Sequence, residues 1–156
     1  MSIERARAHL QKHGLEDRIK EFTVSSATVA LAAQALGCEP ERIAKSLSFE
    51  KGDGAILVLA AGDARIDNRK YKEEFGTKAK MLTPEEVKEL IGHEVGGVCP
   101  FAVNEGVKVC LDKSLKKYDT VYPACGSSNS AIPLTIAELE KCSGYTKWVD
   151  VSKETE

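Results

Sequence analysis

The sequence lacks the patterns that mark membrane-spanning, secreted and zinc-binding proteins. No apolar run approaches the ~18 residues of a membrane span, and residues 1–10 hold no continuous apolar segment of a secretory signal. The five cysteines include no Cys-x-x-Cys pair, so the sequence indicates neither a zinc site nor a redox pair. These absences predict a cytoplasmic protein with free thiols, no membrane contact, no metal and no other cofactor.

An excess of charge of one sign is also lacking. The 24 acidic and 22 basic residues give a net charge of -2, which argues against a protein that coats DNA. Histidine is scarce, at three residues, and no Gly-x-Ser-x-Gly elbow occurs, so a Ser-His-Asp hydrolase is not indicated. His9 and His13 have metal-pair spacing, but the zinc-protease glutamate is missing between them. A solvated helix face is the favoured interpretation.

The 156 residues, 42% of them apolar, predict one domain over residues 1–156, with no repeat and no linker. Helical spacing and capping residues predict helices at 2–13, 28–36, 67–76, 83–92 and from 135 onward. Alternation and apolar runs predict strands at 43–50, 55–61, 78–82, 107–111, 120–124, 131–134 and 145–151. The first two strands form a hairpin through Gly52-Asp53-Gly54. Because hairpin and helical connections alternate, we expect a compact α/β domain with a mixed, partly antiparallel sheet and short surrounding helices.

Lys45 is the most informative single residue. On strand parity it shares a face with Leu47 and Phe49, and a lysine on an apolar face must reach water, find a partner or meet an anionic ligand. The alternative is a lysine at the mouth of a strand whose ammonium lies in water.

Two glycine-rich segments are candidates for contact with a ligand. Gly96 and Gly97, with Pro100 after them, suit a rigid loop whose backbone amides approach an oxyanion or a phosphate. The turn from Gly126 to Ser130 is rich in hydroxyl groups and can hydrogen-bond a polar substrate. An ordinary helix-to-strand connection and a simple turn are the alternatives.

Basic residues concentrate in two segments, residues 65–80 and residues 108–117, each with a local charge of +3. Such segments can follow a phosphate backbone. Two solvated helix faces are the alternative.

Taken together, several segments resemble the YbaK/prolyl-tRNA synthetase-associated editing domains. The resemblance covers roughly residues 20–142. It is carried by the following segments, in order: Thr28 to Gly37, Ile43 to Phe49, Gly96-Gly97-Val98-Cys99-Pro100-Phe101, Ala124-Cys125-Gly126 and Thr135 to Leu139.

The resemblance implies a free-standing aminoacyl-tRNA deacylase that hydrolyses, in trans, the ester between a wrong small amino acid and the tRNA 3′ end. The family lysine corresponds to Lys45, and the family Gly-x-x-x-Pro loop to Gly96 through Pro100. Lys45 is then expected to bind the terminal phosphate or polarise the ester, and the loop to position the adenosine, the aminoacyl group or the attacking water. Catalysis is expected at Lys45 and Gly96. The expected substrate contacts are Thr28, Gly97, Val98, Cys99, Pro100, Gly126 and Ser127.

The chain departs from better-known members after the second glycine turn, where it carries Ser127 to Ser130 in place of basic and acidic residues. Specificity for alanine or cysteine on proline tRNA therefore does not transfer. The expected partners are the acceptor end of aminoacyl-tRNA and a synthetase, with no DNA, and the chain is expected to be a monomer. Two alternatives stay open: a non-catalytic module that binds tRNA or a synthetase, and a cysteine-dependent enzyme that uses Cys99.

Overall fold

A computed structural model of the chain describes residues 2–52 and 54–154. Asp53 of the predicted hairpin turn lies outside these residues. The described strands are β1 (Lys20–Glu21), β2 (Ile43–Lys51), β3 (Gly54–Ala61), β4 (Ala64–Ile66), β5 (Lys108–Asp112), β6 (Thr120–Pro123), β7 (Ser130–Ala131), β8 (Leu134–Thr135), β9 (Lys147–Val149) and β10 (Ser152–Glu154). The helices are α1 (Ser2–Gln11), α2 (Val29–Leu36), α3 (Asn68–Phe75), α4 (Pro84–Glu86) and α5 (Ile136–Ser143). Shorter helical turns are η1 (Glu16–Arg18), η2 (Pro40–Arg42), η3 (Val87–Ile91) and η4 (Lys113–Lys117).

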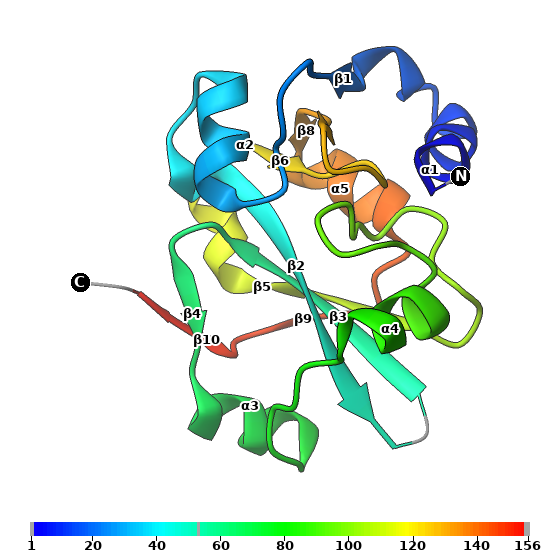
Figure 1. Cartoon of the computed structure of the whole chain (residues 1–156). Coiled ribbons are helices and arrows are strands. Elements are labelled where there is room, and N and C mark those ends of the chain that lie inside the picture. Colours follow the sequence, from blue (N-terminus) through cyan, green and yellow to red (C-terminus); the bar gives the residue numbers. More distant parts are fainter. Residues whose placement is uncertain (1, 53, 155–156) are drawn as a thin grey trace.

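A six-stranded sheet with the order β8-β6-β2-β3-β5-β9 forms the centre of the molecule (Figure 1). The pairs β2–β3 and β6–β8 are antiparallel, whereas β2–β6, β3–β5 and β5–β9 are parallel. Two further pairs, β1–β7 and β4–β10, join distant parts of the chain. The expected mixed α/β fold is confirmed.

The apolar run of β3 is buried on both faces of the sheet, as its sequence predicts. Leu57 and Leu59 face the core that α1 and α5 cover, while Ile56 and Val58 face a second core that Tyr71 of α3 helps to close. The central hairpin therefore carries both cores. Among the described residues no helix is long and apolar enough to cross a membrane.

Helix ends follow the predicted capping residues. Thr28 caps α2, Asp67 caps α3, and Thr83 and Thr135 each form a capping box with the glutamate three residues later. The chain after Glu86 continues as the π-helical turn η3 up to Gly92. The helix predictions are confirmed within one or two residues.

Three predicted strands need correction. Residues 78–82 make only an isolated bridge, Phe49 to Met81, in which Glu50 N donates to Lys80 O and Leu82 N donates to Ser48 O. Residues 131–134 divide into the ends of β7 and β8 around Pro133, which has no N–H to donate to a ladder. Residues 145–151 contain only the short strand β9.

Candidate functional site

A cavity of about 380 Å³ lies at the open edge of β2. β2 pairs with β6 only at Ile43 and Ala44, and further along it Leu82 N donates to Ser48 O at 3.1 Å. Between these contacts no strand of the described residues lies along this edge of β2 at Ser46. The cavity fills this gap, with the N-terminus of α2 on one side and the segment before α4 on another. We call it the β2 cavity.

Ser46 presents polar groups to the β2 cavity. Its Oγ is buried and has no hydrogen-bond partner among the described residues. Backbone groups of alternate residues in a strand point to the same edge. Since Ser48 O faces the open edge, the amide and carbonyl of Ser46 face it too. Ser46 thus offers a ligand at this edge two hydrogen-bond donors, its amide and its hydroxyl, and two acceptors, its carbonyl and its hydroxyl oxygen.

Lys45 also lines the cavity, and its ammonium anchors the turn after β3. Nζ donates to Gly62 O at 3.3 Å and also to Ala64 O. Burial lowers the pKa of Lys45, an effect that Asp63 opposes and Arg65 reinforces. A lysine on an apolar face must reach water, find a partner or meet an anionic ligand. In this structure Lys45 finds partners, which are backbone carbonyls. An ammonium has three N–H donors, so with two bonds to carbonyls of the described residues, a third N–H is available for a ligand.

The N-terminus of α2 forms a second polar wall. Thr28 lines the cavity, and its Oγ1 accepts a hydrogen bond from Leu31 N at 3.1 Å. The free amides of a helix N-terminus carry a partial positive charge, which favours negative charge in the cavity. Val29 and Ala32, on the same helix, add apolar surface. The wall therefore suits a ligand with an anionic or carbonyl oxygen and a small apolar group.

The loop after η3 reaches the cavity through Gly96. This glycine has φ of 95°, and a Cβ on it would lie 3.2 Å from the Cβ of Ala27. At the next residue, Gly97, a Cβ would lie only 2.6 Å from Ser127 N and 2.7 Å from Gly126 C. The two glycine-rich segments therefore pack backbone against backbone, and a side chain at Gly97 would separate them.

The second glycine turn, Gly126 to Ser130, packs beside the β2 cavity. Ser127 Oγ donates to Asn129 Oδ1 at 3.0 Å and contacts Ser130 Oγ at 2.7 Å. Ser130 itself lines the β2 cavity. Gly97, Gly126 and Ser127 line a neighbouring cavity instead, also of about 380 Å³, beside His93. These three expected substrate contacts do not line the β2 cavity.

Cys99, one of the expected substrate contacts, lies in the core. It is fully buried, and burial raises the pKa of its thiol to about 12. Its Sγ lies 3.6 Å from His93 Nε2, which donates to Phe101 O at 2.7 Å. Neither Cys99 nor Pro100 lines either cavity. The cluster holds the loop in shape, and a thiol with this pKa is a poor nucleophile near neutral pH.

Four of the nine predicted site residues line the β2 cavity together: Thr28, Lys45, Gly96 and Val98. Ser26, Ser46 and Ser48 also line the wall and are not predicted as site residues, whereas Ser130 belongs to the glycine turn that is a candidate for ligand contact. The alternation of Ser46 and Ser48 in a strand was a signal for a polar face. Among the described residues, no group of three or more His, Cys, Asp or Glu side chains is placed to hold a metal ion.

Comparison with known proteins gives matches over most of the chain. Residues 23–142 match the family model of the aminoacyl-tRNA editing domain. The uncharacterized protein YwhH of Bacillus subtilis (strain 168) is 52% identical over 157 aligned positions, which span both chains completely. Proline–tRNA ligase of Geobacillus sp. (strain WCH70) is 34% identical over 110 residues, which are 70% of this chain and 19% of the ligase. The chain thus matches about a fifth of that ligase.

A solved structure of a proposed trans-editing enzyme for prolyl tRNA synthetase superposes with a TM-score of 0.87. That protein is 34% identical, and the match covers 97% of each chain.

Proposed function

Since the chain belongs to the aminoacyl-tRNA editing domain family, we propose that it is a trans-acting deacylase of misacylated tRNA. The observation that carries the proposal is the β2 cavity. Lys45, Ser46 and Gly96 line it together, in a chain that belongs to this family. The reaction is hydrolysis. Water adds to the ester carbonyl, the bond to the ribose oxygen breaks, and the free amino acid and tRNA leave.

The groups at the open edge of β2 match the charge that develops in this reaction. Addition of water places negative charge on the former carbonyl oxygen, and donors preorganised around that oxygen lower the barrier. The Ser46 amide, the remaining N–H of Lys45 and the amides at the start of α2 are such donors. The Gly96 backbone positions the ester or the attacking water.

The preferred substrate carries a small amino acid. The apolar part of the wall, with Val29, Ala32 and Val98, leaves room for a small side chain, and a cavity of about 380 Å³ must also accept part of the terminal nucleotide. Such a pocket distinguishes one methylene by only about 1–3 kcal/mol, so it selects mainly by excluding larger side chains.

Single-turnover deacylation tests the proposal. We would measure release of Ala, Cys, Ser, Thr and Pro from several tRNAs by the wild type and by Lys45→Ala. We expect fast release of one or two small amino acids and a loss of about 100-fold in Lys45→Ala, which is the usual cost of one oxyanion donor. Activity of Lys45→Ala equal to wild type would remove this lysine from the mechanism.

Lys51→Ala is the matched control. Lys51 lies on the same strand, and its Nζ also donates to a backbone carbonyl, that of Phe75, but it does not line the cavity. We expect full activity in this variant. Because Lys45 also anchors a turn, the denaturant midpoints of both variants are measured, so that unfolding is not mistaken for lost catalysis.

A second candidate is a binding module without turnover. The polar edge of the β2 cavity would suit binding of a tRNA 3′ end as well as hydrolysis. Salt-dependent tRNA binding, with no release of any amino acid from the panel, would favour this alternative.

A further inference from the structure

A second cavity, of about 420 Å³, lies beyond the turn that Lys45 anchors. Asp63 and Ala64 of that turn line it, and Ala64 O accepts from Lys45 Nζ. Its wall carries four lysines from three elements: Lys70 of α3, Lys113 and Lys117 of η4, and Lys153 of β10. We call it the lysine cavity. The fold thus joins parts of the two basic segments, which are about 40 residues apart in the sequence.

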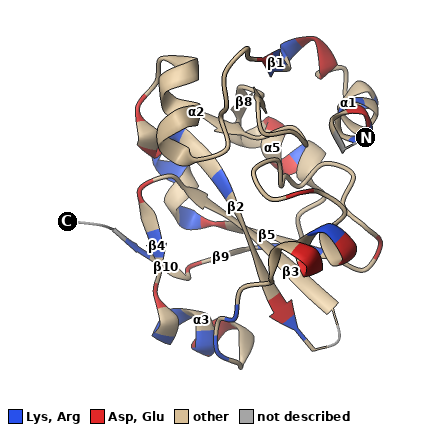
Figure 2. Cartoon of the chain, viewed as in Figure 1, with Lys and Arg blue, Asp and Glu red and all other residues tan. Residues whose placement is uncertain are grey.

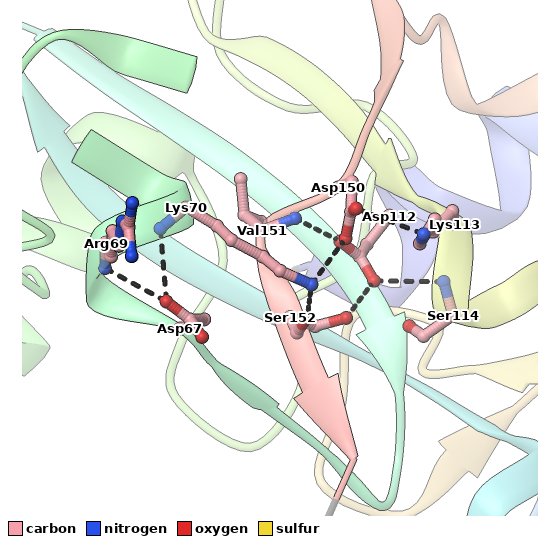
Figure 3. A network of polar contacts seen from close by, with 9 residues as sticks. All are labelled: Asp67, Arg69, Lys70, Asp112, Lys113, Ser114, Asp150, Val151 and Ser152. Carbon is pink, nitrogen blue, oxygen red and sulfur yellow. Dashed lines mark hydrogen bonds and ion pairs between the residues drawn. The ribbon is translucent and has the colours of Figure 1, made fainter. Parts of the chain in front are cut away.

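The lysine cavity rests on a buried polar framework (Figure 3). Asp112 is fully buried and accepts hydrogen bonds from Ser114 N at 3.0 Å, Val151 N at 2.9 Å and Ser152 Oγ at 2.6 Å. These bonds fix η4 against the start of β10. The lysines of both elements therefore start from fixed backbone positions.

Positive charge exceeds negative charge at this cavity. Asp150 pairs with Lys70 at 3.2 Å and with Lys113 at 3.0 Å, so one carboxylate is shared between two ammonium groups. Asp63 is the only acidic residue of the described wall. Figure 2 shows further basic positions on α3 and β4.

The pairing of β4 with β10 adds to this excess of positive charge. Arg65 of β4 lies directly opposite Lys153 of β10 in the antiparallel register. Like charges in directly opposite positions destabilise a strand pair. An anionic ligand at the lysine cavity would offset this repulsion.

We infer that the lysine cavity binds the phosphodiester backbone of the RNA strand whose 3′ end enters the β2 cavity. The inference rests on the proposed function for the identity of that strand. Lys45 lines the β2 cavity and bonds to Gly62 and Ala64, and Ala64 lines the lysine cavity, so a single turn separates the two. A strand that leaves the first cavity across this turn brings its next phosphates to the lysines.

The contact is to phosphates rather than to bases. The described wall holds lysines, aspartate, serines and alanine, and no aromatic ring on which a base would stack. Phosphate contacts position a nucleic acid and carry no sequence information. The lysine cavity therefore strengthens binding of many tRNAs equally, and leaves selection to the β2 cavity.

The test is a triple variant, Lys113→Gln, Lys117→Gln and Lys153→Gln. Lys70 is left in place because it also donates to Ser152 O at 2.8 Å. Binding of uncharged tRNA is measured against salt concentration. Each lost phosphate contact lowers the slope of log K against log salt by about 0.7–0.9, so we expect a slope smaller by about 2 and a Kd about tenfold higher at physiological salt.

The control removes three other exposed lysines, Lys12, Lys108 and Lys141, which do not line the lysine cavity. It carries the same net charge as the test variant, so a difference between the two is due to position and not to total charge. Equal slopes in the two variants would overturn the inference. We also expect the KM for aminoacyl-tRNA to rise about tenfold in the test variant, with kcat within about twofold of wild type.

The binding assay separates the inference from the proposed function. A wild type that binds tRNA through these lysines and releases no amino acid would contradict the deacylase proposal and support the inference. Deacylation by the wild type, together with a test variant whose salt slope equals that of the wild type, would support the deacylase proposal and contradict the inference.

Discussion

At the scale of single residues, the buried hydroxyl of Ser46 lowers the stability of the ligand-free protein, and a ligand would remove this effect. The Ser46 hydroxyl has no hydrogen-bond partner in the described structure. A buried polar group without a partner costs about 1–3 kcal/mol. A bound ester or phosphate at the open edge of β2 would supply the missing partner. The residue is therefore placed for binding at the expense of stability.

Ser46→Ala is expected to separate activity from stability. Removing an unpartnered hydroxyl should leave the free energy of unfolding unchanged or raise it by about 1 kcal/mol. Losing one hydrogen bond to the substrate should lower kcat/KM about five- to tenfold. Urea denaturation and single-turnover deacylation measure the two effects.

Ser143→Ala is the matched control, because Ser143 Oγ is also buried without a partner but lies on α5, outside the β2 cavity. It should change stability in the same direction and leave activity intact. Equal activity of the two serine variants would contradict the role given to Ser46.

The sequence predicts Lys45 and Gly96 as site residues but not Ser46. Lys45 stands out because a charged residue interrupts an apolar face. Ser46 occupies an ordinary polar position of an alternating strand, and its importance depends on the absence of a neighbouring strand. That absence follows from long-range pairing, which local pattern does not contain.

At the scale of elements, the two glycine segments act as one unit. Gly97 lies against the backbone of Gly126 and Ser127, and Gly96 beside it reaches the β2 cavity. Residues 20–21 and 130–131 join the same region through β1 and β7. The position of Gly96 relative to Ser46 therefore depends on contact between two loops that are distant in sequence.

Gly97→Ala should disrupt this contact. The added methyl group would lie 2.6–2.8 Å from backbone atoms of Gly126 and Ser127, which cannot rotate away. Overpacking of this kind typically costs about 1–3 kcal/mol of stability, and the shifted loop should lower kcat/KM as well. Thermal unfolding and deacylation measure both.

Gly54→Ala is the comparison variant, since a Cβ there would lie 3.9 Å from Lys51 O and the residue has no positive φ. It should affect stability much less than Gly97→Ala and leave turnover unchanged. Comparable losses in the two variants would contradict the proposed loop contact.

Element prediction succeeds where the signal is local. Thr28, Asp67, Thr83 and Thr135 cap helices through bonds to amides two or three residues away, so their sequence neighbourhoods contain the whole signal. The strands β1, β4 and β10 have two or three residues each and exist because of partners far along the chain. No periodicity develops over so short a stretch, and the sequence therefore missed them.

At the scale of the whole molecule, the reactivity of the cysteine thiols measures how often the core opens. All five are free, Cys38 is partly exposed, and Cys99, Cys110, Cys125 and Cys142 are buried. Burial raises the pKa of all four buried thiols, to about 12 for Cys99 and Cys142. Their reaction with a thiol reagent requires opening of the core.

Under native conditions, a chromogenic disulfide reagent should therefore modify one thiol quickly and the other four only at the rate of unfolding. The fast phase should disappear in Cys38→Ser, because that thiol alone is accessible among the five. Deacylation should survive modification of the fast thiol, since Cys38 does not line the β2 cavity. If a second thiol reacted quickly and activity disappeared with it, the loop at Cys99 would open in solution. The cysteine-dependent mechanism would then replace the one built on Lys45 and Ser46.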